Sequence, residues 1–475
     1  MPGDPASSQG PGEATRVVVV GAGVSGLAAG YRVLTRAPEV DLRVLEGSTR
    51  AGGLIGTVRQ RGFVVEQGPD SVLSEKPWGI SLLRRLGLGD EIIGTRQGAR
   101  GAYVVARGKL VRVPSGFSMV APTHLGPLLS SQLLSVGGKL RACWDLVAPR
   151  GPQHEDESLA AFVSRRFGRQ VLDRLVQPLV SGVYGADPER LSVRATLPRF
   201  VELEAEKRSV LRALRRTQDG QRATGARYGL FVSLRSGMGT LTDELANRLG
   251  SCLCLSSSVR SITRTPGHYQ VHLERGQTLR ADRVVVALPA DHAAQILCEL
   301  DSDLAELLRA VSYGSVAIAS FGWPLPAMPR PLDAFGWVAP KIERRSLMAC
   351  TWSSVKFEGR APEGHLLLRA FFGGARCEQL LQQRSDRELL DSARSEIASL
   401  TGIAGEPGLE RLDRHVRSMP QYHVGHLKLV RRIEQRAARH PGLALAGAAF
   451  RGVGIPDAVR SGEAAAEAVL APWAL

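Results

Sequence analysis

The sequence predicts an α/β protein built around a parallel sheet, and three observations support this. Residues 17–20 are four consecutive valines without polar alternation, as expected for a strand buried on both faces. A glycine-rich turn and an apolar helical pattern over 24–34 follow directly. A second strand pattern, VDLRVLE, then completes a β-α-β unit.

The glycine-rich turn has the spacing G-x-G-x-x-G. Gly21 permits a tight turn, Gly23 lets a pyrophosphate approach the backbone, and Gly26 lets the helix pack closely on the strand. Such an anion rests on the N-terminus of the following helix. Glu46 ends the second strand, where a carboxylate accepts hydrogen bonds from the ribose hydroxyls of an adenosine. We therefore predict a Rossmann-like dinucleotide site.

Length and composition fit a globular protein of two or three domains. The chain has 475 residues, of which 44% are hydrophobic and 52 are glycine. No apolar stretch reaches the roughly eighteen residues of a membrane-spanning helix, so we expect none. Residues 1–13 have neither a basic start nor an apolar middle, which predicts a disordered tail without a secretory signal.

The cysteines and histidines do not predict a metal site. Six cysteines lie in apolar contexts without Cys-x-x-Cys spacing, which favours free thiols in a reducing cytosol over disulfides or structural zinc. His423 and His426, in YHVGH, have no third ligand in view. We therefore predict no metal.

The formal net charge of +15 would attract nucleic acid, an anionic membrane or a polycarboxylate substrate. No nucleic-acid-binding module is recognisable, so we expect no nucleic-acid partner. Basic residues are dispersed except in the run 206–229. This run is either a solvated helix end and loop or a basic rim over a substrate or membrane entrance.

A second motif follows the acidic strand. The segment GSTRAGGLIGT gives Arg50, Gly52, Gly53 and Thr57 the pattern R-x-G-G-x-x-x-T. The paired glycines allow a long ligand to lie against the backbone, and the arginine can balance phosphate charge. In this arrangement the sequence resembles the FAD-dependent amine-oxidase-like superfamily, so the predicted cofactor is FAD.

Four further stretches resemble the oxygen-dependent porphyrinogen oxidases of haem biosynthesis. They are VEQGPDS, LVSGVYGADPERLSVRATLPRF, MPQYHVGH and GAAFRGVGIPDAVRSGEAAA, and the resemblance covers the chain from about residue 16 onward. It implies an oxidase that removes six electrons from a porphyrinogen in three two-electron steps, with dioxygen as acceptor and hydrogen peroxide as by-product. We assign no catalytic side chain, because the flavin carries the chemistry.

The stretch GAYVVARGKLVRVPSGFSMVAPT predicts which porphyrinogen is oxidised. It resembles the coproporphyrinogen branch of the family, since Ala102 stands where protoporphyrinogen-type relatives place a basic residue. We predict coproporphyrinogen III as substrate, with protoporphyrinogen IX as the alternative. Arg100, with part of the run from Lys207 to Arg227, is predicted to bind or attract the propionates.

The resemblance also implies a set of cofactor-binding residues. The first glycine turn and the end of the second strand would hold the pyrophosphate and ribose, and the R-x-G-G turn would hold the ribityl region. The GPDS segment and the last turn would contact the isoalloxazine. The backbone of the segment SSSVRSI would contact the adenine. These residues are Gly21, Gly23, Val24, Ser25, Gly26, Glu46, Gly47, Arg50, Gly52, Gly53, Gly68, Pro69, Asp70, Ser71, Val259, Gly447, Val453, Gly454 and Ile455. His415 stands where some relatives carry a tryptophan near the flavin.

The strand pattern ALAGAAF and the helix after it have no obvious partner in the preceding region, which predicts that they return to the first domain. We expect a discontinuous Rossmann-like FAD-binding domain (14–76, 236–300 and 438–475), an α+β substrate-binding domain (77–105, 206–235 and 301–437) and a helical subdomain (106–205). Within these, we expect a hairpin turn at Arg107, Gly108 and Lys109, and helices over 77–94 and 233–250.

Other activities and locations remain open at this point. An amine oxidase or carotenoid desaturase is a second enzyme hypothesis, and a non-redox binding protein on the same fold, as in the GDP-dissociation inhibitors, is a third. We expect a cytoplasmic protein, either monomer or homodimer. The moderately apolar segment 116–140 either caps the substrate entrance or touches a bilayer.

Overall fold

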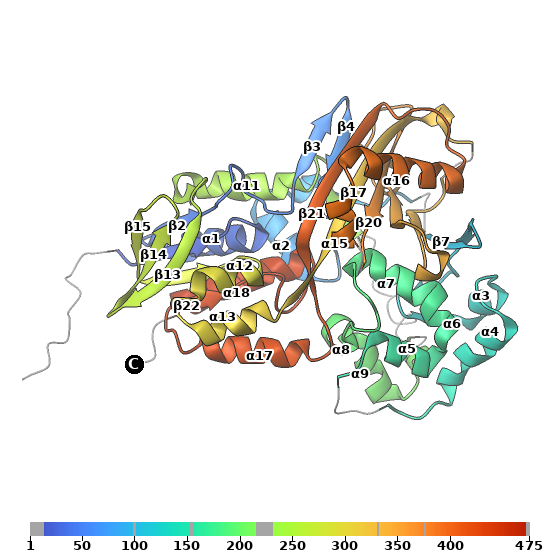
Figure 1. The fold of residues 1–475 in the computed structure, drawn as a ribbon, viewed down its shortest axis with the longest axis horizontal. Coiled ribbons are helices and arrows are strands. Elements are labelled where there is room, and N and C mark those ends of the chain that lie inside the picture. The colour runs from blue at the N-terminus through green and yellow to red at the C-terminus, as the bar shows by residue number, and fades with distance from the viewer. Residues whose placement is uncertain are drawn as a thin grey trace, which may run out of the picture.

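A five-stranded sheet and a seven-stranded sheet organise the chain, and a group of helices lies at the lower right of Figure 1. The structure is a computed structural model that describes residues 14–97, 101–151, 156–214, 231–329, 332–374 and 377–471. The predicted α/β class is confirmed.

The five-stranded sheet has the order β12-β2-β1-β16-β22, with every neighbouring pair parallel. Its strands are β12 (Leu253–Cys254), β2 (Asp41–Leu45), β1 (Arg16–Val20), β16 (Arg283–Val286) and β22 (Leu443–Leu445). Val17 and Val19 pack into one apolar cluster, and Val18 and Val20 pack into another. Since successive side chains of a strand point to opposite faces, β1 is buried on both, as predicted.

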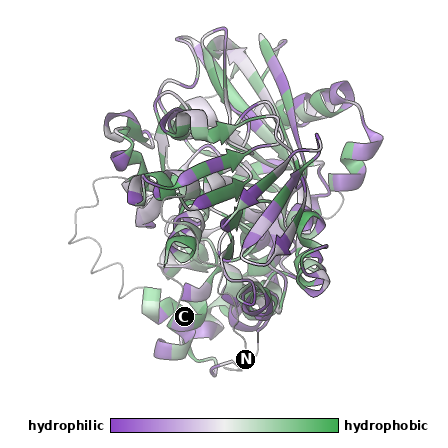
Figure 2. Cartoon of the chain, turned by 90° about the vertical axis from the view of Figure 1, so that its left-hand side faces the viewer, coloured by the Kyte–Doolittle hydropathy of each residue, from purple (hydrophilic) through white to green (hydrophobic). Residues whose placement is uncertain are grey.

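Different elements cover the two faces of this sheet. The first face carries α1 (Val24–Arg36), α2 (Pro77–Arg85), α11 (Gly239–Leu249) and α18 (Ile455–Leu470). The second carries β13 (Val259–Thr265), β14 (His268–Leu273), β15 (Thr278–Ala281), α12 (Ala290–Leu297), α13 (Ser302–Arg309) and α17 (His426–Ala437). Figure 2 shows hydrophobic residues along the central strands and hydrophilic residues on the outer helices.

The last strand and helix pack with the first β-α-β unit. β22 pairs with β16, and α18 packs along α1. The strand predicted over 444–450 is wrong in its extent, because β22 ends at Leu445. Gly447 has φ +133°, a conformation open to glycine, and the chain turns there.

The seven-stranded sheet has the order β21-β17-β20-β19-β18-β7-β8. Its strands are β21 (Leu409–Gln421), β17 (Ser312–Pro324), β20 (His365–Phe372), β19 (Leu347–Trp352), β18 (Gly336–Val338), β7 (Tyr103–Ala106) and β8 (Lys109–Arg112). Helices α15 (Cys377–Gln383) and α16 (Asp386–Thr401) cover one face. The predicted hairpin is confirmed: Arg107 and Gly108 link β7 to β8 with φ of 52° and 74°.

A group of short helices forms its own apolar cluster. It comprises α3 (Leu125–Ser130), α4 (Val136–Cys143), α5 (Leu159–Phe167), α6 (Arg169–Val171), a π-helical turn (Leu172–Val176), α7 (Gln177–Tyr184), α8 (Val193–Thr196) and α9 (Pro198–Lys207). Within the range 106–205, the first elements are strands: β8, β9 (Phe117–Ser118) and β10 (Ala121–Pro122).

Two predicted helices are shorter than expected. In the range 77–94, α2 ends at Arg85 and Gly87 turns the chain with φ +79°. The segment then forms β6 (Ile92–Gly94), which pairs with β11 (Phe231–Leu234). Because β11 takes up the start of the range 233–250, α11 begins only at Gly239. Local helical periodicity did not reveal this long-range strand pairing.

The remaining small strands are β3 (Thr57–Gln60), β4 (Phe63–Glu66) and β5 (Val72–Leu73). All six cysteines are free thiols. Among the residues that the structure describes, no group of three or more His, Cys, Asp or Glu side chains could hold a metal ion. Of the described helices, none is long and apolar enough to span a bilayer.

Candidate functional site

The turn between β1 and α1 is built from the G-x-G-x-x-G motif. Gly21 has φ +97°, and a methyl group on Gly26 would overlap the carbonyl oxygen of Gly21. This contact lets α1 lie close to β1. Gly23 precedes α1, and apart from Gly23 itself and its chain neighbours no atom of the described chain lies within 4 Å of where its β-carbon would be. The backbone of Gly23 is therefore open to a ligand at a helix N-terminus that no side chain caps.

The Glu46 carboxylate lies against this turn. One oxygen accepts a hydrogen bond from the Ala22 amide at 2.8 Å, and the other accepts from the amide and hydroxyl of Ser48 at 2.9 and 2.8 Å. The parallel pairing of β1 and β2 brings their carboxyl ends side by side, which places the acid there. A ribose bound at this position would meet a carboxylate held in place by backbone donors.

The second glycine turn lies directly on the first. The Gly52 amide donates to the carbonyl of Ala22 at 2.8 Å, and Gly23 and Gly52 form a parallel β-bridge. A methyl group on Gly53 would lie 3.2 Å from the α-carbon of Gly23. The two turns thus form a cradle of bare backbone, in which a side chain at Gly53 would crowd Gly23.

Arg50 braces the second turn. Its guanidinium donates to the carbonyls of Gly53 at 2.6 Å and Ile55 at 3.0 Å. This structural role was not predicted. A role of the Arg50 guanidinium in balancing the phosphate charge of FAD stays a prediction.

The predicted adenine segment lies beside Glu46. The Ser257 amide donates to the carbonyl of Glu46 at 2.7 Å, and Val259 begins β13 two residues later. A methyl group on Gly47 would approach the Ser258 hydroxyl to 2.7 Å. The structure thus brings Gly47 and Val259 to the same end of the sheet as the glycine turns.

The last turn reaches the same region. Gly454 precedes α18 and carries no capping side chain, while Ser25 of α1 contacts Gly462 in the middle of α18. Leu288 lies against both Gly21 and Gly447. The final turn is therefore next to the first, although they are more than 400 residues apart in the sequence.

Tyr422 and His426, from the MPQYHVGH stretch, hold this final turn. The Tyr422 hydroxyl donates to the carbonyl of Ala448 at 2.6 Å and accepts from the Gly452 amide at 2.7 Å. The His426 ring stacks on Tyr422 and is 2.9 Å from the carbonyl of Phe450. Burial lowers the pKa of His426, so its imidazole is neutral and holds the turn as a hydrogen-bond donor. Sequence reasoning missed both roles.

The GPDS segment lies across one face of the seven-stranded sheet. His415 Nε2 is 2.7 Å from the carbonyl oxygen of Gln67, and Arg369 donates to the carbonyl of Gly68 at 2.6 Å. The backbone amide of Gln67 donates to the carbonyl of Gly56 at 2.8 Å, so the segment is joined to the R-x-G-G turn. His415, which stands where some relatives carry a tryptophan near the flavin, therefore contacts the residue next to the segment predicted to lie against the isoalloxazine.

Apolar side chains continue the same face of the sheet. Ile318 is directly opposite Phe371 across β17 and β20, and Val316 is opposite His415 across β17 and β21. Directly opposed residues share a face, so these side chains lie on the face that carries Arg369. Arg369 and Lys356, which both contact Asp70, were not predicted from the sequence.

The remaining predicted cofactor residues lie in the segments described above, and Arg100 cannot be placed. Val24 and Ile455 open α1 and α18, Val453 precedes the last helix, and Pro69 and Ser71 flank Asp70 in the GPDS segment. Arg100 lies outside the described residues, as do the tail 1–13 and the part of the basic run from 215 onward. The described part of that run includes Arg208, which donates to the carbonyl of Val147 at 2.8 Å.

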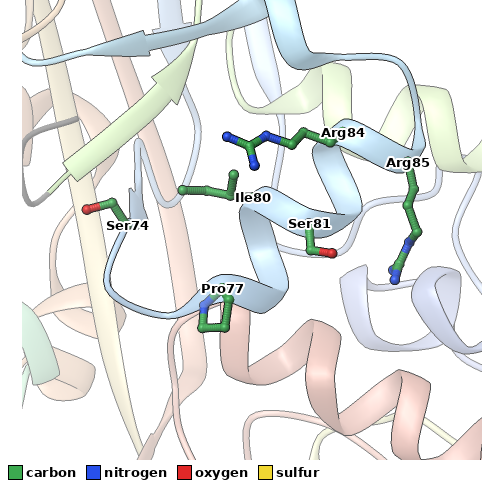
Figure 3. A pocket seen from close by; sticks show the side chains of 6 residues that line it. All are labelled: Ser74, Pro77, Ile80, Ser81, Arg84 and Arg85. Carbon is green, nitrogen blue, oxygen red and sulfur yellow. The ribbon is translucent and has the colours of Figure 1, made fainter. Parts of the chain in front are cut away.

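A pocket of about 520 Å³ lies along α2, where Figure 3 shows its lining side chains. They are Ser74, Pro77, Ile80, Ser81, Arg84 and Arg85. None of these six belongs to the predicted cofactor set. The two facing glycine turns, the fixed acid and the uncapped helix N-termini fit an extended dinucleotide better than this surface hollow does.

Comparison with known proteins gives matches over nearly the whole chain. The family described as flavin containing amine oxidoreductase matches residues 24–470. Coproporphyrinogen III oxidase of Bacillus subtilis (strain 168) is 34% identical over 458 residues, covering 94% of this chain and 96% of that protein. Chloroplastic protoporphyrinogen oxidase of Nicotiana tabacum is 30% identical over 454 residues, covering 88% and 78%.

A solved structure has the same fold. It is a protein of Exiguobacterium sp. 255-15, provisionally assigned as a protoporphyrinogen oxidase, with a TM-score of 0.85 and 29% sequence identity. The match covers 96% of this chain and 99% of that one.

Proposed function

Because the chain belongs to the flavin containing amine oxidoreductase family, we propose that it is an FAD-dependent oxidase that converts coproporphyrinogen III to coproporphyrin III. The observation that carries this proposal is the similarity to coproporphyrinogen III oxidases along nearly the full length of both chains. It agrees with the porphyrinogen oxidase resemblance drawn from the sequence motifs. Protoporphyrinogen IX is the second candidate substrate, since protoporphyrinogen oxidases also match.

Each predicted cofactor segment would hold a different part of an extended FAD. The facing turns at Gly23 and Gly53 would cradle the pyrophosphate, Glu46 would accept from the adenosine ribose, and the segment at Val259 would meet the adenine. Asp70 and its neighbours would lie near the isoalloxazine. The bound flavin supplies the electron acceptance that no side chain can provide.

The reaction balances as follows. A porphyrinogen loses six hydrogen atoms in becoming a porphyrin, which is three two-electron oxidations. Three molecules of dioxygen take up the six electrons and six protons and leave as three molecules of hydrogen peroxide.

The protein's part is to bind and orient the macrocycle. We infer that it lies on the sheet face beside the GPDS segment, where Val316, Ile318 and Phe371 offer apolar surface. Ile318 is buried, and Phe371 and Val316 are half-buried. Such a surface suits a flat, largely apolar ring and excludes water from it.

The charge of the chain suits the four propionates of coproporphyrinogen III. A net charge of +15 would steer a tetra-anion toward the protein, and the effect would weaken as salt screens it. We propose that Arg100 contributes to propionate binding. An Arg100→Ala variant should raise KM for coproporphyrinogen III, and an unchanged KM would remove Arg100 from this role.

We also propose the domain division 14–76, 236–300 and 438–475 for the FAD-binding domain. The pairing of β2 with β12 and of β16 with β22 supports it. We likewise propose 77–105, 206–235 and 301–437 as the substrate-binding domain and 106–205 as the helical subdomain. Within these ranges, α2, α13 and α17 pack on the five-stranded sheet, and strands begin the helical subdomain.

For location, we propose the cytoplasm, with contact to a bilayer as the alternative. Val136 and Leu140, on one side of α4, are 74% and 67% exposed and belong to the segment 116–140. A carbonate wash of bacterial membranes should release the protein. Full retention in the pellet would favour the bilayer.

The test of the proposed function is a side-by-side fluorescence assay. Purified holoprotein is given coproporphyrinogen III or protoporphyrinogen IX, and porphyrin formation and peroxide release are followed together. We expect higher kcat/KM for coproporphyrinogen III. Faster turnover of protoporphyrinogen IX would establish the second candidate, and activity on neither would refute both.

A further inference from the structure

A buried ionic cluster lies directly behind the GPDS segment. Lys356, the last residue of α14 (Ser353–Lys356), places Nζ 3.0 and 3.2 Å from the two carboxylate oxygens of Asp70. Arg369 of β20 places Nη1 3.6 Å from the same carboxylate and donates from Nη2 to the carbonyl of Gly68. Two cations from the seven-stranded sheet and its adjoining helix therefore hold both ends of a short loop.

The cluster is largely removed from water. The Arg369 side chain is 1% exposed, that of Lys356 is 11% exposed and that of Asp70 is 15% exposed. Burial raises the pKa of Asp70, but Lys356 and Arg369 outweigh it and hold that pKa well below its usual value. Asp70 is therefore ionised, and the three groups carry one net positive charge.

A second layer continues the cluster. The Ser233 hydroxyl donates to the carbonyl of Asp70 at 2.6 Å and accepts from Arg360 at 2.7 Å. Arg360 is in turn 3.6 Å from the carboxylate of Glu66, whose pKa is raised by burial. Counting both layers, three cations face two carboxylates, so the whole cluster keeps a net positive charge.

Buried ion pairs cost much of what they gain, because both charges lose their hydration. A cluster of this kind at a loop predicted to touch a cofactor is therefore a candidate for a functional role. Lys356 sharpens this point, since its ammonium also lies about 5 Å above two aromatic rings, 5.1 Å from the centroid of Phe231 and 4.9 Å from that of Phe357. The charge is thus fixed in position.

We propose that Lys356 and Arg369 are positioning residues that fix the GPDS loop against the flavin and raise the flavin reduction potential. The inference rests on the proposed FAD site. A fixed positive potential in a region of low dielectric constant favours added negative charge nearby, and electrons arriving at the isoalloxazine bring such charge. The seven-stranded sheet thereby contributes to the redox properties of a cofactor bound by the other sheet.

The test is the flavin midpoint potential of purified holoprotein, measured by anaerobic reductive titration against a reference dye. Lys356→Met removes a positive charge and should shift the potential to lower values, whereas Asp70→Asn removes a negative charge and should shift it to higher values. Lys356→Arg keeps the charge and should restore most of the wild-type potential. In Lys356→Met, kcat should fall while KM changes little.

Arg436→Met is the matched control, because Arg436 also pairs with a buried aspartate, Asp301, but on α17. It should lower thermal stability and leave the flavin potential unchanged. Equal potentials in wild type, Lys356→Met and Asp70→Asn, or shifts of the same sign in both variants, would overturn the proposal. If Lys356→Met yields no holoprotein, Asp70→Asn alone tests the proposal: a higher flavin potential supports it, and an unchanged or lower potential overturns it.

These measurements use no porphyrinogen. They therefore separate this inference from the proposed function: a protein that turns over neither porphyrinogen still reports the potential of its flavin. A wild-type protein that binds no flavin would refute the proposed function first.

Discussion

The Glu46 carboxylate accepts a hydrogen bond from the backbone amide of Ala22 at 2.8 Å, and so joins the end of β2 to the turn after β1. The same turn carries the second glycine turn through the Gly52 amide and the Ala22 carbonyl. The backbone of Ala22 thus fixes both the Glu46 carboxylate and the second glycine turn, which we assign to FAD binding.

Replacing Glu46 should weaken FAD binding. Glu46→Gln keeps an acceptor oxygen for Ala22 but loses the charge, so its hydrogen bonds to ribose hydroxyls become weaker. We expect the Kd of the apoprotein for FAD to rise about tenfold, a loss of about 1.4 kcal/mol, as measured by flavin fluorescence. Glu244→Gln, in an exposed i,i+4 ion pair of α11, is the control and should leave Kd unchanged. An unaltered Kd in Glu46→Gln would exclude the ribose contact.

Two neighbouring glycines should respond differently to the same substitution. Gly23→Ala has room in the protein and a φ of −67°, which alanine adopts, so the apoprotein should keep its Tm. Its added methyl group would point into the space assigned to the pyrophosphate and should weaken FAD binding.

Gly26→Ala should instead destabilise the protein itself, by about 1–3 kcal/mol or more, because the methyl group overlaps the Gly21 carbonyl. Thermal unfolding of both apoproteins, with FAD titration, checks the pair. Normal FAD affinity in Gly23→Ala would argue against a close approach of the dinucleotide at this turn.

The helical group depends on a buried arginine. The Arg166 side chain is fully buried, lies 3.3 Å from Asp145 and also contacts Glu204. Arg166→Met leaves the buried carboxylate of Asp145 without its cation, whereas Glu204 keeps Arg165, and should lower the free energy of unfolding by about 3–5 kcal/mol in urea titrations. Arg169→Met, at a side chain that is 63% exposed, should cost less than about 1 kcal/mol. Equal effects of the two substitutions would mean that the burial of Arg166 does not matter.

Asp301 should make stability depend on pH. Burial raises its pKa, but hydrogen bonds from Arg436 at 2.6 Å and His440 at 2.7 Å outweigh this and hold the pKa below its ordinary value. A depressed pKa gives stability that is present above the unfolded value, about 3.9, and is lost as the pH falls toward the folded value.

The free energy of unfolding of wild type should therefore exceed that of Asp301→Asn by a constant amount near pH 6. That difference should shrink below about pH 4. Urea titrations at several pH values measure it, and a difference that grows on acidification would contradict the assignment.

Local patterns in the sequence predicted the parts of the fold that local physics determines. The valines of β1 and the turn at Gly21 needed only side-chain shape and backbone freedom, and the hairpin at Arg107 and Gly108 needed only its turn residues. The FAD set came from such motifs together with family resemblance. Its members around both glycine turns do lie together in space.

Contacts between distant segments could not be predicted in this way. Asp70 meets Lys356 across 286 positions, and Tyr422 meets Gly452 across 30, with no periodicity to announce either contact. The helix predicted over 77–94 ended early for the same reason, because β6 pairs with β11 from a segment far along the chain. The sequence around Lys356, SSVKFEG, does not indicate its role, because only the folded sheet brings Lys356 beside the carboxylate of Asp70.

We propose that a porphyrinogen gives its electrons to a flavin bound by this chain. The most direct measurement is to mix purified holoprotein with coproporphyrinogen III without oxygen and follow the flavin absorbance and the porphyrin fluorescence. We predict that the yellow flavin band bleaches as porphyrin appears, and that air restores it with release of hydrogen peroxide. A flavin that stays oxidised in the presence of excess porphyrinogen would show that this electron transfer does not take place.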